Sequence, residues 1–177
     1  MAEIKLYIAT SLDGYIARKN NSLDWLNALQ VPEGEDFGYG EFYSGIDTVL
    51  MGANTYKEVL SFGVDWPYED CKSYVISRHG GFDITTPKTE RIEELDLQRV
   101  EELQKESQKG IWLVGGGQLI NQFLLMEKID RFVITIIPIL LGEGIPLFPE
   151  GFKDVELELE KVESMDPGVV NLFYKKK

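Results

Sequence analysis

A two-residue alternation of apolar and polar side chains, typical of a half-buried strand, first appears at residues 3–10, EIKLYIAT. Ile4, Leu6 and Ile8 would share one face of that strand. Several later apolar runs are short enough to be strands, and the chain ends in two of them joined by a tight-turn sequence, Asp-Pro-Gly. These runs are 47–52 (DTVLMG), 73–77 (SYVIS), 111–114 (IWLV), 131–142 (RFVITIIPILLG, interrupted by Pro138) and a final hairpin within 155–175.

A helical period of three to four residues replaces this alternation between the strands. Four residues from Leu97 to Gln104 fall on one face of a predicted helix, and Gly110 is predicted to cap its end. Residues 20–35 are polar and contain a proline and a glycine, so we predict a loop there. The other predicted helices are 36–46 (DFGYGEFYSGI), 53–62 (ANTYKEVLSF) and one that begins near Gln118.

The order of these elements predicts the fold class. Strands alternate with helices in the first part of the chain and pair directly at its end, which favours an α/β protein with a mostly parallel central sheet and an antiparallel C-terminal hairpin. The chain has 177 residues without a repeat or a linker, so we expect one domain over 1–177. A chain of this length buries roughly 70% of its unfolded surface, which is enough for a substantial core.

Composition and charge narrow the function classes. The net charge of −12 argues against nucleic acid as a partner, because phosphate backbones are bound by basic surfaces. One cysteine and one histidine are too few for an internal disulfide or the usual structural zinc site, and we predict no metal. The N-terminus does not have the form of a signal peptide and no apolar run approaches 18 residues, so we expect a cytoplasmic protein without a membrane partner.

Three consecutive glycines stand between a predicted strand and a predicted helix in WLVGGGQLINQFLL, residues 112–125. Glycine lets a backbone approach a phosphate closely, and a helix N-terminus favours an anion. The stretch lacks the Rossmann fingerprint, which requires glycine where Ile120 stands, and it lacks the Gly-Lys-Ser/Thr of a P-loop. The glycines alone therefore leave two interpretations open, a phosphate-binding loop and a tight turn with nothing bound.

Two further strand ends favour the first interpretation. Gly52, Asn54 and Thr55 open a helix directly after one strand, and Ser77 and Arg78 follow another. Ligands of open α/β sheets bind outside the carboxyl ends of the strands. Three such ends with glycine, hydroxyl and cationic groups suit an extended phosphorylated cofactor. Taken singly, the threonine is more often a local hydrogen-bonding group and the arginine a solvated charge.

Taken together, these motifs resemble the dihydrofolate reductase-like superfamily. The stretches that carry the resemblance are YIATSLDGYIA, VLMGANTYKE, SYVISR, WLVGGGQLINQFL and ITIIPILLGEGIPLFP, which cover nearly the whole chain in the family's order. The chain is most similar to the branch that contains the reductase domain of bacterial riboflavin-pathway deaminase/reductases. The resemblance implies a three-layer fold, a homodimer, and hydride transfer from NADPH to a heterocyclic C=N or a sugar-imine carbon.

The same resemblance implies a cofactor site. The backbone at Ala9 and Ile16 would hold the nicotinamide, the glycine loop would wrap the pyrophosphate, and the Gly115–Gly116 peptide bond would be cis. The full set of implied cofactor-binding residues is Ala9, Ile16, Gly52, Asn54, Thr55, Ser77, Arg78, Val114, Gly115, Gly116, Gly117, Gln118 and Leu119. Ala53 stands where the family usually has an arginine that holds the 2′-phosphate of NADPH, so NADH is not excluded.

On the substrate side, the resemblance implies Asp36 as the acid and Thr135 as its support. Hydride addition to C=N needs a proton on nitrogen, and a desolvated carboxyl has a raised pKa suited to deliver it directly or through water. The alternative for Asp36 is a helix cap. Trp25 would either line the nicotinamide pocket or pack in the core. Cys71 stands where folate-reducing members carry an arginine for the folate tail, so dihydrofolate is expected to be a poor substrate.

Two functions follow from these observations. The first is an NADPH-dependent reductase of a small pteridine or pyrimidine, with an activity like that of 5-amino-6-(5-phosphoribosylamino)uracil reductase in riboflavin biosynthesis. The second is a non-catalytic nucleotide-binding protein that keeps the cofactor loop. NADPH oxidation with a panel of heterocycles separates the two.

Overall fold

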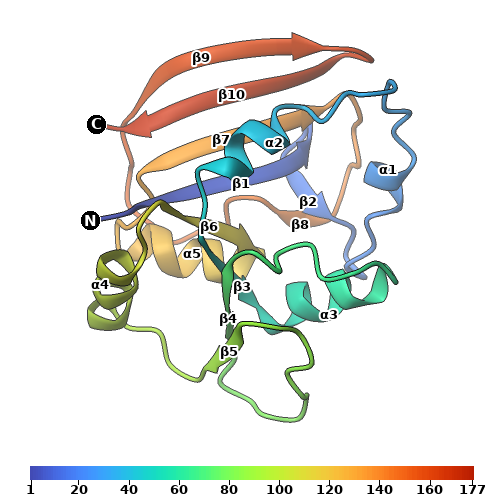
Figure 1. The fold of residues 1–177 in the computed structure, drawn as a ribbon. Helices are drawn as coiled ribbons and strands as arrows, with labels where there is room; N and C mark the ends of the chain where they lie inside the picture. Colours follow the sequence, from blue (N-terminus) through green and yellow to red (C-terminus); the bar gives the residue numbers. More distant parts are fainter.

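The computed structural model describes residues 1–177 and contains an eight-stranded sheet, a two-stranded sheet and five helices (Figure 1). The strands are β1 (Glu3–Ser11), β2 (Tyr15–Ala17), β3 (Thr48–Gly52), β4 (Lys72–Ile76), β5 (Thr89–Ile92), β6 (Gly110–Gly115), β7 (Arg131–Ile137), β8 (Ile145–Pro146), β9 (Leu157–Met165) and β10 (Val169–Lys176). The helices are α1 (Asp24–Asn27), α2 (Tyr39–Ser44), α3 (Ala53–Ser61), α4 (Leu97–Glu106) and α5 (Gly117–Leu125).

The large sheet has the strand order β5-β4-β3-β6-β1-β7-β10-β9. All pairs from β5 to β7 are parallel, whereas β10 pairs antiparallel with both β7 and β9. The C-terminal hairpin therefore forms one edge of the sheet and β5 the other (Figure 1). This arrangement confirms the predicted mostly parallel sheet with its antiparallel hairpin.

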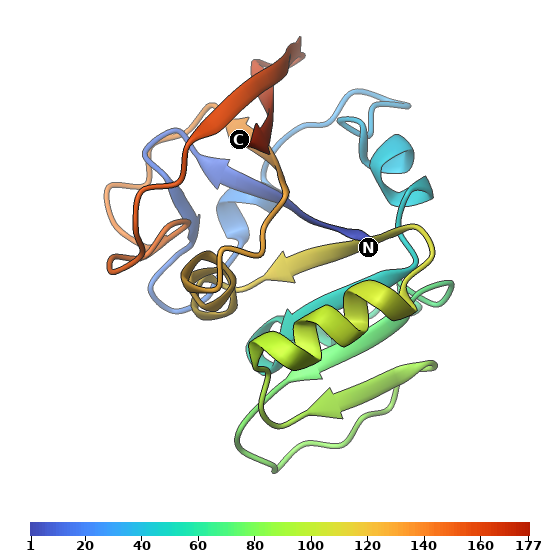
Figure 2. The ribbon, with the colours of Figure 1, turned by 90° about the vertical axis from the view of Figure 1, so that its left-hand side faces the viewer.

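Helices cover both faces of the sheet, which gives the three layers that were expected. Phe123 of α5 shares a core with Leu50 of β3, and α4 contributes to the same cluster. Tyr56 of α3 shares the opposite core with Met51, and α2 packs against that cluster. Because consecutive residues of β3 enter opposite cores, this strand is apolar on both faces, as buried parallel strands are. Figure 2 shows the strong twist of the sheet between the two edges.

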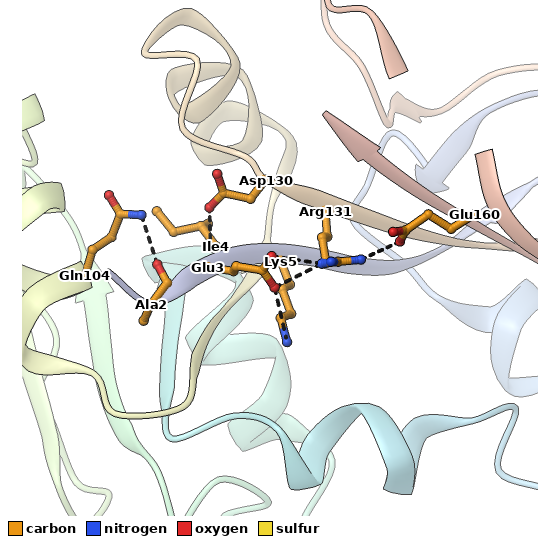
Figure 3. Close-up of polar contacts among 8 residues, drawn as sticks. All are labelled: Ala2, Glu3, Ile4, Lys5, Gln104, Asp130, Arg131 and Glu160. Carbon is orange, nitrogen blue, oxygen red and sulfur yellow. Dashed lines mark hydrogen bonds and ion pairs between the residues drawn. The ribbon is translucent and has the colours of Figure 1, made fainter. Parts of the chain in front are cut away.

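The start of β1 is fixed by polar contacts at the end of the sheet opposite the strands' carboxyl ends (Figure 3). The Ile4 amide donates to Asp130 Oδ2 at 2.7 Å, and Gln104 Nε2 donates to the Ala2 carbonyl at 3.0 Å. Arg131 forms ion pairs with Glu3 and Glu160 (Figure 3). The chain therefore enters the central strand in a defined register, far from the edge that carries the glycine junctions.

Several predicted boundaries were wrong for local reasons. The predicted loop at 20–35 contains the one-turn helix α1, and the short strands β5 and β8 carried no strand signal because they are polar or only two residues long. Gly110 does not cap a helix but begins β6, where an added Cβ would lie 2.8 Å from the Gly45 carbonyl oxygen. In β9, Leu159 is 50% exposed, so the apolar side of the predicted alternation is not a buried face.

None of the helices combines the length and the apolar character needed to cross a membrane. No group of three or more His, Cys, Asp or Glu side chains is placed to hold a metal ion.

Candidate functional site

The three strand ends that the sequence singled out lie side by side. In the register of the sheet, Met51 of β3 is opposite Gly115 of β6, and Gly52 is opposite Ile76 of β4. A Cβ added to Gly52 would be 3.9 Å from the Gly115 carbonyl oxygen and 4.0 Å from the Gly116 nitrogen. The backbones of two glycine junctions are thus in contact at the carboxyl edge of the sheet, where ligands of such sheets bind.

Two helices begin at this edge with their N-termini close together. Gly52 caps α3 and Gly116 caps α5, and neither cap has a side chain that could accept from the first amides. Neither helix has an acidic residue in its first turn. The first N–H groups of a helix have no intrahelical partner, and the macrodipole adds partial positive charge there. Two uncapped N-termini at one place therefore form an anion-binding edge.

The three glycines of the loop have different reasons to be glycine. Gly115 has φ +123°, which side chains rarely adopt, and its peptide bond with Gly116 is cis, as the resemblance implied. At Gly117 an added Cβ would lie 3.3 Å from the Pro146 carbonyl oxygen, a tight contact, so close packing favours glycine. Gly116 has φ −81°, and a Cβ there would lie 3.5 Å from Thr55 Oγ1, an ordinary contact. Neither a positive φ nor a close contact beyond the neighbouring residues requires glycine at position 116.

The implied nicotinamide-binding residues lie next to the glycine loop. A Cβ on Gly117 would be 3.9 Å from Ile16 Cδ1, and one on Gly115 would be 3.8 Å from Ile8 Cδ1. Ala9, the next residue of β1, is opposite Thr135 of β7. The cofactor edge and the implied catalytic strand are therefore connected through β1.

The outer residues of the implied cofactor site are mostly exposed. Asn54 and Arg78 are exposed, and Arg78 forms no ion pair. Ser77 Oγ donates to the His79 carbonyl at 2.7 Å and so holds the local turn. The Leu119 amide donates to the Gly116 carbonyl at 2.9 Å. The amides that precede it in α5, those of Gly117 and Gln118, are the ones left without an intrahelical partner.

The environment of Asp36 differs from the expectation. Its side chain is exposed, so it is not the desolvated carboxyl that was expected. Asp36 Oδ1 accepts from the Gly38 amide and Oδ2 from the Gly40 amide, both at 2.9 Å, which makes Asp36 a cap for the start of α2. It forms no hydrogen bond with Thr135, whose hydroxyl is buried without a partner. This placement follows from the path of residues 20–38, which the sequence patterns did not predict.

A polar cluster that the sequence did not single out surrounds Thr135. Asn171 of β10 is directly opposite Thr135, and both residues are buried. Asn171 Nδ2 donates to the Phe37 carbonyl at 2.7 Å, and the Tyr7 hydroxyl donates to the same oxygen at 3.2 Å. Burial raises the pKa of Tyr7, so its hydroxyl remains a donor at neutral pH. The only sequence signal for Asn171 was a polar residue among apolar neighbours in the final strand.

Trp25 and Cys71 are both core residues. Trp25 is buried with Ile137 and Val169, in agreement with the packing alternative. Cys71 is buried, and its thiol lies 3.4 Å from the Tyr43 hydroxyl. Burial raises the pKa of this thiol.

Comparison with known proteins places these features in a family. A model of the RibD C-terminal domain matches residues 2–171. The protein YwjB of Bacillus subtilis (strain 168) is 41% identical over 157 residues, which cover 88% of this chain and 87% of that protein. The range matched by the family model therefore includes both the glycine loop and the Thr135–Asn171 pair.

Solved structures agree in fold. A crystal structure from Shewanella sp. PV-4, named provisionally as a riboflavin biosynthesis protein, has a TM-score of 0.88 at 34% identity and covers 100% of this chain and 99% of its own. A Thermotoga maritima deaminase and 5-amino-6-(5-phosphoribosylamino)uracil reductase has a TM-score of 0.71 at 17% identity, covering 99% of this chain and 57% of that one. At that identity the second comparison shows a common fold.

Proposed function

Because this chain belongs to the family of RibD C-terminal domains, we propose that it is an NADPH-dependent reductase of a small pteridine or pyrimidine. The reaction would deliver a hydride to a C=N or sugar-imine carbon and a proton to the adjacent nitrogen. The Thermotoga maritima protein of the same fold supports this proposal through the reductase activity in its name. The name of that protein includes a phosphoribosylamino-uracil as the compound reduced, so one such compound belongs in the assay.

The observation that carries the proposal is the glycine at position 116. It caps α5 beside the N-terminus of α3, and neither its φ nor its packing requires glycine. A dinucleotide pyrophosphate needs an uncapped helix N-terminus and a backbone without a side chain in the way. The residues present therefore fit the cofactor. When bound, NADPH would supply the hydride.

The chain's own residues would divide the remaining work. The amides at the start of α5 would hold the pyrophosphate, and Asn54, Thr55 and Arg78 would bind the adenosine side. Backbone groups at Ala9 and Ile16 would orient the nicotinamide. We keep Asp36 as the proposed proton relay rather than as a desolvated acid, because its carboxylate is open to water and its charge acts on the Tyr7 hydroxyl of the polar cluster.

The test is NADPH oxidation, followed by absorbance, with dihydropterins and aminouracil ribosyl phosphates. We expect turnover with at least one of these compounds and saturable binding of NADPH without substrate. Binding of NADPH without turnover on any of them would instead support the non-catalytic nucleotide-binding protein. Absence of NADPH binding would contradict both functions.

Dihydrofolate is expected to be a poor substrate. Cys71 is buried against Tyr43 and cannot hold the glutamate tail, for which a guanidinium forms paired hydrogen bonds. We expect a kcat/KM for dihydrofolate below about 10⁴ M⁻¹s⁻¹, the lower end of the ordinary range for enzymes. A dihydropterin without the tail is the matched control, and equal efficiency on both compounds at or above that value would contradict the prediction.

A further inference from the structure

Thr135 and Asn171 form a cross-strand pair in which each residue has a side-chain oxygen without a hydrogen-bond partner of ordinary geometry. Thr135 is 4% exposed and Asn171 is 0% exposed. Thr135 Oγ1 and Asn171 Oδ1 are both buried without a hydrogen-bond partner. An unsatisfied buried polar group is costly, so such groups are retained where something else satisfies them. Two of them on adjacent residues of one face mark a place built for a polar partner.

The orientation of the Asn171 amide is fixed by its neighbour. Its nitrogen donates to the Phe37 carbonyl at 2.7 Å. A carbonyl oxygen can only accept, so the atom that contacts the Phe37 carbonyl is Nδ2 and not Oδ1. Asn171 therefore presents one donor that is engaged by a carbonyl and one acceptor that nothing engages.

The Phe37 carbonyl lies against Asn171 in the way that the carbonyl of a bound ligand would. It accepts from two side chains of different strands, Asn171 and Tyr7. Phe37 has φ +55° and Gly38 has φ +79°, so two consecutive left-handed residues bring this carbonyl onto the sheet. A Cβ on Gly38 would be 3.9 Å from Asn171 Nδ2, which shows how closely the segment covers the pair.

We propose that Asn171 is the specificity-determining residue for the heterocyclic substrate and that it binds a lactam edge, a ring N–H beside a ring carbonyl. The ring carbonyl takes the place of the Phe37 carbonyl on Asn171 Nδ2, and the ring N–H donates to Asn171 Oδ1. Thr135 Oγ1 binds a second polar group of the same ring. The inference rests on the proposed function, because it locates the substrate of that reaction.

The chemistry of the carboxamide selects this ligand class. A primary amide and a lactam form two parallel hydrogen bonds, donor to acceptor and acceptor to donor, in the way asparagine pairs with a base edge. An alkylated ring nitrogen loses one of the two bonds and leaves Oδ1 unsatisfied. The site also adjoins Ala9 through Thr135, so a ring held there lies beside the implied nicotinamide position.

The chain offers a matched control in Gln104. Like Asn171, it is a buried amide whose nitrogen donates to a backbone carbonyl, that of Ala2 at 3.0 Å, and whose oxygen has no partner. It lies at the opposite end of the sheet, where Figure 3 shows it beside the start of β1. Asn171→Leu and Gln104→Leu therefore remove the same kind of group from two different places.

The experiment measures binding of two probes, 6-aminouracil and 6-amino-1,3-dimethyluracil, by NMR titration. The second probe lacks both ring N–H groups. We expect the unmodified protein to bind 6-aminouracil about ten-fold more tightly than the dimethyl compound, as one lost hydrogen bond implies. Asn171→Leu should abolish this difference, and Gln104→Leu should keep it. Thr135→Val, which removes a hydroxyl that acts on Tyr7 but forms no hydrogen bond of ordinary geometry, should weaken 6-aminouracil binding and leave the protein folded.

The inference is overturned if the unmodified protein does not distinguish the two probes, or if Asn171→Leu still does. It is also overturned if Gln104→Leu removes the difference equally, because the effect would then be general. Should Asn171→Leu fail to fold, Thr135→Val decides, and unchanged 6-aminouracil binding in that variant would contradict the proposal. NADPH oxidation is read separately. If the protein distinguishes the two probes but turns over no substrate, the proposed reductase function is contradicted and the inference is not. If the protein turns over a substrate but Asn171→Leu still distinguishes the two probes, the inference is contradicted and the reductase function is not.

Discussion

Gly116→Val is expected to weaken NADPH binding by about two orders of magnitude while leaving the fold intact. The extra side chain would occupy the space in which the pyrophosphate meets the first amides of α5. Charge-assisted hydrogen bonds contribute about 1.5–3 kcal/mol each, so loss of two of them is sufficient for this change. Fluorescence titration with NADPH measures the effect.

The fold is expected to tolerate the change because of the local geometry at position 116. Its φ of −81° and ψ of −166° are extended backbone, outside the left-handed region that favours glycine. An added Cβ has an ordinary 3.5 Å contact with Thr55 Oγ1. Gly45→Ala is the control, since its Cβ would also have its nearest contact at 3.5 Å, with the Phe42 carbonyl oxygen. Unchanged NADPH affinity in a folded Gly116→Val protein would refute the phosphate-loop assignment.

The sequence was sufficient to predict that the glycine junctions meet at one edge of the sheet, because its signals are local. A buried strand, a glycine and an amphipathic helix follow one another within about a dozen residues at both junctions, and parallel strands bring their carboxyl ends to one edge. The contact between Gly52 and the Gly115–Gly116 backbone then follows from the strand order. The role of Gly116 stays a prediction, and the structure adds that the contact of an added Cβ with Thr55 Oγ1 would be an ordinary one.

The substrate side was less predictable because its residues meet through long-range register. Asn171 and Thr135 lie on different strands, far apart in the sequence, and only the β7–β10 pairing makes them neighbours. The position of Asp36 depends on the path of a polar segment with few apolar anchors. Its carboxylate found partners two and four residues away, at Gly38 and Gly40, which local chemistry favours for aspartate before a helix. The periodicity of apolar residues predicts neither the pairing of Asn171 with Thr135 nor the position of Asp36.

Ala53→Arg is expected to tighten NADPH binding about ten- to one hundred-fold and to leave NADH binding nearly unchanged. Ala53 is the first residue of α3, directly after the Gly52 cap. Gly52 is opposite Ile76 in the sheet, so the new guanidinium would lie near the segment that carries Ser77 and Arg78. A 2′-phosphate at this edge would gain a paired, charge-assisted contact that the ribose of NADH cannot make.

Arg78 provides the complementary measurement. It is exposed and forms no ion pair, so Arg78→Ala should remove charge without breaking an internal contact. If Arg78 already serves the 2′-phosphate, Arg78→Ala reduces the preference for NADPH, and Ala53→Arg restores it in the double variant. Equal tightening of NADPH and NADH by Ala53→Arg would show that the arginine binds the pyrophosphate common to both. That result would move the 2′-phosphate away from the start of α3 and would contradict the assignment of this edge to the adenosine ribose.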